Sequence, residues 1–250
     1  MTFRFTCEYD GTDFSGFQRQ KNGPSIQAAL EEAFSRVLNE PITIVGSGRT
    51  DAGVHAEGQV CSFKIAPKFL NLDKVMFSVN SLLPPAIAIR DLRIAPEGFN
   101  ARFSAKAKLY TYSCYLSKLP MPMLNRYSLQ LYKPINLEEM KKAAKILSGR
   151  HDFSSFCSAK TDKESKVRDV MIAIYDTEHV SDRHPAEISI VLIGNGFLRN
   201  MVRIIVGTLI EVGEGKRSAE SIKEVLAAKD RGVAGKTAPA HGLCLSKVGY

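Results

Sequence analysis

The sequence predicts an α+β protein that consists of two halves with a similar order of elements. Apolar and polar residues alternate strictly from Thr2 to Tyr9, which is the period of a half-buried strand. From Ile26 to Leu38 the apolar residues recur at helical spacing. A second series of strand and helix patterns begins at Leu109. Short strands that can pair antiparallel, mixed with helices in each half, are typical of the α+β class.

The first half opens with the strand Thr2–Tyr9, which leads into a turn-rich loop, Asp10–Gly23. Ser25 then carries the hydroxyl that suits an N-cap, so a helix starts after it. A later helical pattern ends before Pro84, because the residue before a proline disfavours the helical conformation. The other elements expected here are strands at Ile42–Val45 and Gln59–Ile65, a helix at about Leu72–Leu82 and a strand at Ile87–Ile94.

The second half opens with a β-favouring run, Leu109–Leu116, that contains three tyrosines. A helix follows that Asn136 can cap, with Glu139 three residues further on and Gly149 beyond its end. Further on we expect strands at Val167–Tyr175 and Glu187–Ile193, helices at Phe197–Val212 and Ala219–Lys229, and a last strand near Leu243–Val248.

We expect the chain to divide into an N-terminal half, residues 1–104, and a C-terminal half, residues 105–250. The halves share an order of elements but no visible sequence repeat. The order of elements is therefore the sole indication that the halves arose by duplication. The region between them is basic, since Arg102, Lys106 and Lys108 fall there.

The composition is that of an ordinary globular protein, because 44% of the 250 residues are hydrophobic and 24% are charged. The five cysteines are odd in number and never spaced C-x-x-C, which predicts neither a disulfide framework nor a zinc site and favours the cytoplasm. The most apolar stretch, Met201–Val212, is too short to span a membrane. A net charge of +8 favours a polyanionic partner such as RNA or DNA.

The segment Gly46–His55 joins two expected strands and combines three glycines with Arg49 and Asp51. A dinucleotide-binding fingerprint would need glycine in place of Asp51 and a helix directly after it. The glycines instead favour a rigid turn that presents Arg49 and Asp51 to a ligand. Two alternatives stay open: a plain hairpin in which Asp51 forms an Asx turn, and a small-molecule enzyme that binds phosphate through these glycines.

Three other patterns resemble catalytic motifs but lack the required context. Residues Gly232–Thr237 end like a Walker A loop, yet its first glycine would have to stand at Asp230. The histidines form no H-E-x-x-H pattern, and His179 and His184 belong to an expected exposed loop. Ser154 lacks the G-x-S-x-G elbow of a hydrolase, so its run is expected to be a loop with two core phenylalanines.

Aromatic and basic residues of the second half suit a nucleic-acid site. Tyr110 and Tyr112 share one face of their expected strand, and Arg203 lies in the helix expected after Gly194 and Gly196. Aromatic rings stack on bases and arginine contacts phosphate in such sites. Core packing or cross-strand pairing of the tyrosines is the alternative.

Four motifs stand out when the chain is read as a whole. They are Tyr9-Asp10-Gly11-Thr12 with Gly16-Phe17-Gln18; Gly48-Arg49-Thr50-Asp51-Ala52-Gly53-Val54-His55; Arg102-Phe103-Ser104-Ala105 leading to Tyr110; and Gly196-Phe197-Leu198 with Met201-Val202-Arg203. Together they resemble the TruA family of tRNA pseudouridine synthases. The resemblance runs on to Thr237–Ala240 and Leu243, so it covers essentially the whole chain.

The resemblance implies two α+β halves of the ferredoxin-like or RRM-like type, with mixed, mainly antiparallel sheets, that face each other across a basic cleft. It also implies a homodimer that acts on tRNA and needs neither a metal nor an organic cofactor. The expected reaction isomerises uridine to pseudouridine at positions 38, 39 and 40 of the anticodon stem-loop.

Carried over by position, the resemblance makes Asp51 the nucleophile, Tyr110 the aromatic residue against the target uracil and Arg203 the cation that pairs with Asp51. It also places Leu243 in the base pocket and Arg49 among the substrate-binding residues. The change from an N-glycosidic to a C-glycosidic bond needs no redox agent, so one carboxylate can suffice. A nearby arginine, Arg203 or Arg49, would keep that carboxylate ionised.

The chain departs from the family pattern at Phe14 and Phe17, where the family often has tyrosine and tryptophan. The loop Asp10–Gly23 that carries them is expected to contact RNA, so the change bears on the choice of uridine more than on the reaction. A divergent paralogue with a shifted RNA site is therefore one alternative. A non-catalytic RNA-binding protein is the other, because the charge and the strand tyrosines would serve it equally.

Overall fold

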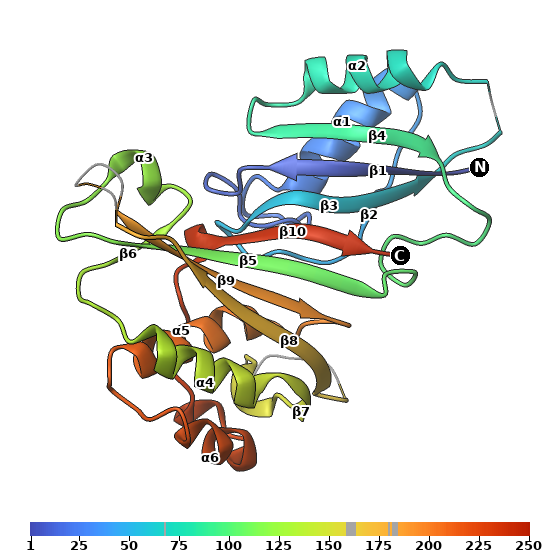
Figure 1. Cartoon of the computed structure of the whole chain (residues 1–250). Coiled ribbons are helices and arrows are strands. Elements are labelled where there is room, and N and C mark those ends of the chain that lie inside the picture. Colours follow the sequence, from blue (N-terminus) through green and yellow to red (C-terminus); the bar gives the residue numbers. More distant parts are fainter. Residues whose placement is uncertain (68, 159–163, 180, 182–184) are drawn as a thin grey trace. The chain divides into compact units, whose positions relative to one another are not determined.

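The computed structural model describes residues 1–67, 69–158, 164–179, 181 and 185–250 (Figure 1). These residues form two compact units by their internal contacts. Unit 1 comprises Met1–Lys106 together with Cys244–Tyr250, and unit 2 comprises Ala107–Leu243. Both units combine helices with mainly antiparallel strands, which confirms the predicted α+β class. The division into folding domains at residues 1–104 and 105–250 stays a prediction.

Unit 1 is a sheet with two helices. Its elements are β1 (Thr2–Tyr9), α1 (Ile26–Leu38), β2 (Val45–Gly46), β3 (His55–Lys64), α2 (Leu72–Leu82), β4 (Ile87–Ile94) and β10 (Leu243–Gly249). The strand order is β4-β1-β3-β10, with β1 antiparallel to both neighbours and β10 parallel to β3. Helix α1 packs on this sheet through Phe34, whose ring centroid lies 4.9 Å from that of Phe5 and 4.8 Å from that of Phe63.

Unit 2 combines the other strands with its own helices. Its elements are β5 (Ala107–Leu116), α3 (Pro122–Asn125), β6 (Leu129–Leu131), α4 (Leu137–Leu147), β7 (Gly149–Asp152), β8 (Val167–Asp176), β9 (Ala186–Gly194), α5 (Met201–Gly213) and α6 (Ser221–Ala228), with short 3₁₀ turns at Ser154–Phe156, Arg231–Val233 and Ala240–Gly242. The strands run in the order β5-β9-β8-β7 with antiparallel pairing, and β6 pairs parallel with β5. Figure 1 shows α4, α5 and α6 together on one side of this sheet.

The local signals in the sequence are confirmed where side chains cap helices. The Ser25 hydroxyl accepts a hydrogen bond from the backbone N–H of Ala28 at 3.3 Å, and the Asn136 side chain accepts one from Glu139 at 3.1 Å. Strands β1 and β4 and helix α2 have the predicted bounds. These elements follow local rules of capping, alternation and proline placement.

The predicted strand at Ile42–Val45 is wrong, because only Val45 and Gly46 pair with β3. The backbone groups of Ile42 and Ile44 bind side chains of helix α1 instead of another strand. The Ile42 N–H donates to the Ser35 hydroxyl at 2.9 Å, and the Ile44 N–H donates to the Glu31 carboxylate at 2.9 Å. The apolar residues of this stretch are thus buried against a helix. A buried strand shows the same sequence pattern, so the pattern alone does not distinguish the two.

Two other predicted bounds are corrected. Helix α5 begins at Met201, four residues after the predicted start at Phe197, because Asn200 adopts a left-handed conformation with φ of 61° that no helix continues through. Strand β3 begins at His55 and not at Gln59, since Ala56 pairs with Tyr9. Short elements α3, β6 and β7 carry too few residues for a visible period and were not expected.

The Ser154 motif and His179 lie in ordinary structural surroundings. Phe153 and Phe156 are both fully buried, as expected for a loop with two core phenylalanines. His179 is exposed, whereas His184 lies outside the described residues. None of the helices in the described part of the chain is long and apolar enough to cross a membrane.

Candidate active site

Residues 47–54 of unit 1 form the loop between β2 and β3 that carries Asp51. Thr50 is buried, Asp51 is partly exposed and Arg49 is exposed. The loop thus turns its threonine inward while the two predicted site residues on either side reach the surface. Hydrogen bonds with Tyr9 on β1, with Phe17 in the loop after β1 and with Gln59 on β3 hold this loop.

A second loop lies against the Asp51 loop with backbone touching backbone. At Gly16, where φ is +101°, an added Cβ would lie only 2.8 Å from the carbonyl oxygen of Thr50. At Gly11 an added Cβ would lie 2.0 Å from the carbonyl oxygen of Val54. The two glycines therefore permit an approach that any side chain would block. The Phe17 N–H completes the contact with a 3.1 Å hydrogen bond to the Thr50 carbonyl.

Phe17 is a buried support for the Asp51 loop. Only 3% of its surface is exposed, its ring lies 6.3 Å from that of Tyr9, and an added Cβ at Gly46 would lie 2.6 Å from its ring. The departure from the family pattern at this position therefore changes packing beneath the loop. Phe14, the other departure, is partly exposed.

His55 closes the far end of the Asp51 loop. Its side chain is buried, and its Nδ1 accepts a hydrogen bond from the Gly11 N–H at 3.1 Å while lying 3.2 Å from a carboxylate oxygen of Asp10. The histidine thus ties the end of β1 to the start of β3. Among the described residues, no group of three His, Cys, Asp or Glu side chains could hold a metal ion.

Tyr110 in unit 2 lies on β5 and is 7% exposed. Its ring meets the ring of Phe197 edge to face, at 5.2 Å between centroids and 87° between planes. An added Cβ at Gly194 would lie 3.0 Å from the Phe197 ring, so the glycine makes room for this pair. The sequence predicts Phe197 as a helical residue, although its place in the Gly196-Phe197-Leu198 motif could have marked it as part of the site.

Arg203 lies in the first turn of α5 and is held by the segment that precedes β10. Its Nε donates to the Ala238 carbonyl at 2.7 Å, and the Ala238 N–H donates to the Arg203 carbonyl at 3.0 Å. The Tyr112 hydroxyl donates to the neighbouring Pro239 carbonyl at 2.9 Å. Burial raises the pKa of Tyr112 far above its ordinary value, and the charge of Arg203 opposes that shift. Leu243, buried, follows at the start of β10.

The Gly232–Thr237 motif serves packing. An added Cβ at Gly207 of α5 would lie 1.8 Å from the Lys236 carbonyl oxygen, and the Gly235 N–H donates to the Thr208 hydroxyl at 2.9 Å. The chain therefore runs along α5 in close contact with its backbone. This contact leads directly to Ala238, so the motif positions the segment that holds Arg203.

A family model described as "tRNA pseudouridine synthase" matches residues 6–104 and 143–250 of this chain. The matched residues make up most of both units and include Asp51, Arg203 and Leu243. The chain belongs to the tRNA pseudouridine synthase family. It is thus an isomerase of the class that converts uridine to pseudouridine in tRNA.

Relatives named tRNA pseudouridine synthase A match the chain over nearly its full length. The protein of Brevibacillus brevis is 47% identical over 247 residues, covering 99% of this chain and 98% of its own. That of Syntrophotalea carbinolica is 44% identical, covering 99% and 95%. That of Bacillus subtilis is 43% identical, covering 100% and 99%. The resemblance to the TruA family seen in the sequence is confirmed.

Tyr110 falls between the two stretches that match the tRNA pseudouridine synthase model. The prediction of Tyr110 as a site residue therefore depends on the motif that precedes it in the sequence. It also depends on the contact of Tyr110 with Phe197, which lies inside a matched stretch. The structure brings Arg49 and Asp51 together on one loop of unit 1. In unit 2 it gathers Tyr110 with Phe197, and Arg203 with Ala238.

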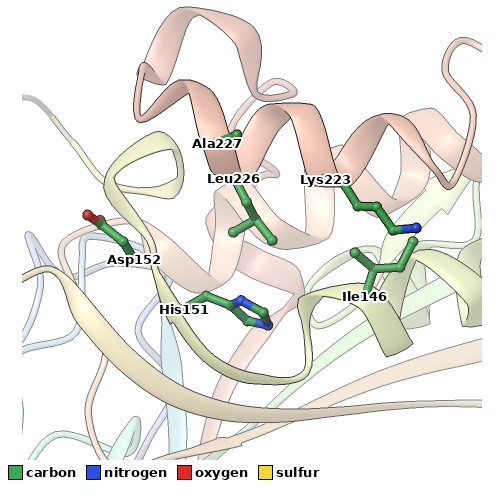
Figure 2. Close-up of a pocket in the computed structure, with 6 residues that line it drawn as sticks. All are labelled: Ile146, His151, Asp152, Lys223, Leu226 and Ala227. Carbon is green, nitrogen blue, oxygen red and sulfur yellow. The ribbon is translucent and has the colours of Figure 1, made fainter.

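A cavity of about 550 Å³ in unit 2 is unrelated to these residues (Figure 2). The end of α4, strand β7 and helix α6 contribute its lining, which is Ile146, His151, Asp152, Lys223, Leu226 and Ala227. Hydrogen bonds from the Ser154 hydroxyl and from Lys229 hold the pKa of Asp152 below its ordinary value. The acid is thus engaged in local structure, and none of the predicted site residues lines this cavity.

Proposed function

We propose that this protein isomerises uridine to pseudouridine in the anticodon stem-loop of tRNA, at positions 38, 39 and 40, with Asp51 as the nucleophile. The observation that carries the proposal is the Asp51 loop itself. Its backbone is held against Gly11 and Gly16 while the carboxylate of Asp51 stays partly exposed. A rigid loop that presents one accessible carboxylate is what nucleophilic catalysis requires.

The reaction rearranges one bond and conserves all atoms. The Asp51 carboxylate attacks the ribose or the uracil ring, and the N-glycosidic bond breaks. The uracil then turns and rejoins the ribose through C5, the bond to Asp51 breaks, the proton on C5 leaves to a base, and N1 takes up a proton. No electron acceptor and no external group enters this balance.

Tyr110 and Arg203 are proposed as the other catalytic residues. Tyr110 stacks on the uracil as it turns and assists loss of the C5 proton, and its edge-to-face contact with Phe197 supports this role by fixing the ring. Arg203 pairs with the Asp51 carboxylate and balances its negative charge. The hydrogen bond from its Nε to the Ala238 carbonyl fixes the guanidinium within unit 2.

Substrate binding draws on the basic character of the chain. A net charge of +8 favours contact with tRNA phosphates. The target uridine has to leave its base stack, which costs a few kcal/mol. We assign Arg49, which is exposed beside Asp51, to the RNA, and Leu243 to the pocket that receives the base.

We further propose a cytoplasmic homodimer. The support is one face of the unit 2 sheet that the helices do not cover. On β8 and β9 this face carries Met171, Tyr175 and Ile193, which are 66%, 62% and 39% exposed. Met171 and Ile193 are cross-strand partners, so their side chains form one continuous apolar surface.

The experiment that tests the function is release of tritium from C5-labelled tRNA by the purified protein. Wild-type protein should release tritium without any added cofactor, and Asp51→Asn should release none while binding tRNA within about threefold of wild type. Glu32→Gln, an exposed acid on α1, is the matched control and should keep full activity. Mapping the product on the RNA tests positions 38, 39 and 40.

Turnover by Asp51→Asn would overturn the nucleophile assignment. Binding of tRNA with no tritium release by the wild type would favour the non-catalytic RNA-binding protein. Pseudouridine at other positions would identify a paralogue with a shifted site.

A further inference from the structure

Four buried polar side chains lie beneath the Asp51 loop. They are Tyr9 on β1, Ser47 and Thr50 in the loop, and Gln59 on β3, and each is at most 7% exposed. We call them the Gln59 cluster. A buried polar group costs stability unless it is hydrogen-bonded. The hydrogen-bond partners of these four side chains therefore indicate their role.

The Gln59 cluster binds the loop residues that precede Asp51. The Gln59 amide donates to the Gly48 carbonyl at 2.9 Å and accepts from the Ser47 hydroxyl at 2.6 Å. The Tyr9 hydroxyl and the Thr50 hydroxyl lie 2.8 Å apart. Side chains of two different strands therefore hold residues 47, 48 and 50.

The backbone at Asp51 is held on both sides as well. The Thr50 carbonyl accepts from the Phe17 N–H at 3.1 Å, and the Asp51 carbonyl accepts from the Val54 N–H at 3.2 Å. Thr50 is thus fixed through its side chain and its main chain at once. Because the Cα–Cβ bond of Asp51 leaves a backbone constrained in this way, the position of its Cβ, from which the carboxylate projects, depends on the bonds to Thr50.

We propose that Tyr9, Thr50 and Gln59 are positioning residues for the Asp51 carboxylate. The inference rests on the proposed role of Asp51 as the nucleophile. The Tyr9–Thr50 hydroxyl pair sets the attack geometry, and Gln59 keeps the loop entrance at residues 47 and 48 in register with it. None of the three touches the substrate, so their loss slows the chemical step and spares tRNA binding.

Stability and positioning make different demands on the hydroxyl pair. Replacing both partners of a buried hydrogen bond by apolar groups of the same shape is close to neutral for stability. Tyr9→Phe keeps the ring and Thr50→Val keeps the shape of the side chain. If the pair served stability alone, the double variant would behave like wild type, whereas a positioning pair leaves the double variant folded and slow.

The experiment compares Tyr9→Phe, Thr50→Val, the double variant and Thr50→Ser by tritium release, tRNA affinity and melting temperature. Each single variant should lower kcat by about 10-fold to 100-fold and leave KM and tRNA affinity within about threefold, since small displacements of a reacting group cost this much. The double variant should be no slower than Tyr9→Phe, because Tyr9→Phe already removes both the bond to Thr50 and the contact with the Gln59 amide. Thr50→Ser, which keeps the hydroxyl, should recover most of the rate.

Ser62→Ala is the matched control. Ser62 is a buried hydroxyl on β3, outside residues 47–54, that accepts from the Ala101 N–H at 3.1 Å. It should lower the melting temperature and leave kcat unchanged. Gln59→Glu keeps the size of the side chain but removes the donor to Gly48, and it should lower kcat without weakening tRNA binding.

An unchanged kcat in Tyr9→Phe, which retains the ring and its packing, would overturn the inference. So would strictly additive losses in the double variant, or a loss in kcat that Ser62→Ala matches at the same melting temperature. These outcomes leave the proposed function intact as long as Asp51→Asn is inactive. Full turnover by Asp51→Asn would instead remove the function on which the inference rests.

Discussion

At the scale of single residues, the glycines around Asp51 show how a missing side chain can shape a site. Gly11 and Gly16 allow two loops to touch through their backbones, and only one of the two, Gly16, also needs a positive φ. Gly11 is therefore required only because a side chain would not fit, whereas Gly16 is required both for its positive φ and for the lack of space. The positions differ in which requirement a substitution would violate.

Gly16→Ala is expected to impair both stability and catalysis. The new Cβ would lie 2.8 Å from the Thr50 carbonyl oxygen, so the residue before Asp51 would have to move. We expect a loss of more than about 2 kcal/mol in the free energy of unfolding and a fall in kcat of at least about tenfold. Urea denaturation and tritium release measure the two effects.

Gly98→Ala is the matched control for that prediction. Gly98 also has a positive φ, of +76°, but an added Cβ would meet nothing within 4 Å. It should lose only the roughly 1–2 kcal/mol of a left-handed alanine and keep its kcat. Equal losses of activity in the two variants would show that strain, and not contact with Thr50, affects the site.

At the scale of elements, helix α1 replaces a strand as the partner of residues 42–44. The buried Glu31 accepts from the Ile44 N–H and from the Gln27 amide, at 2.9 and 3.1 Å, and also pairs with Arg19. One acid therefore links the helix, the chain leading to β2 and the loop that supports Asp51. The sequence shows the acid but not its partners, which come from three segments.

Glu31→Ala should destabilise unit 1 by about 1–3 kcal/mol, because the Ile44 N–H would stay buried without its acceptor. Glu32→Ala changes the next residue of the same helix, which is exposed, and should cost less than about 0.5 kcal/mol. Thermal and urea unfolding give both values. A similar cost for the two variants would mean that solvent reaches the Ile44 N–H.

At the scale of the whole molecule, the apolar face of β8 and β9 predicts the oligomeric state. Met171→Glu places a charge in the centre of that face, which is 66% exposed at this residue. If two copies meet there, burying the charge would be costly and the dimer should dissociate at micromolar concentration. Sedimentation equilibrium measures the change, with the wild type expected as a dimer.

Phe77→Glu provides the comparison, since Phe77 on α2 is 76% exposed but belongs to unit 1 and to neither β8 nor β9. It should leave the dimer unchanged. A monomeric wild type, or a Met171→Glu variant that stays dimeric, would contradict the proposed interface.

Much of the fold could be predicted from the sequence because it follows local rules. The alternation of apolar and polar residues predicts β1 and β4. The capping side chains of Ser25 and Asn136 predict where two helices begin. Four motifs, including the one around Asp51, together indicate the family. These signals depend on residues close together in the chain, so a sequence carries them in full.

Only the tertiary structure decided what depends on distant partners. The stretch at residues 42–44 is not a strand because α1 takes its backbone hydrogen bonds, and Phe197 leaves the helix pattern to meet Tyr110. The role proposed for Thr50 depends on the Tyr9 hydroxyl, which is 41 positions away in the sequence and is brought to Thr50 by β1. Sequence alone thus determined the fold class, the family and the nucleophile predicted for it. The hydrogen bonds that orient that nucleophile are long-range, and no local pattern encodes them.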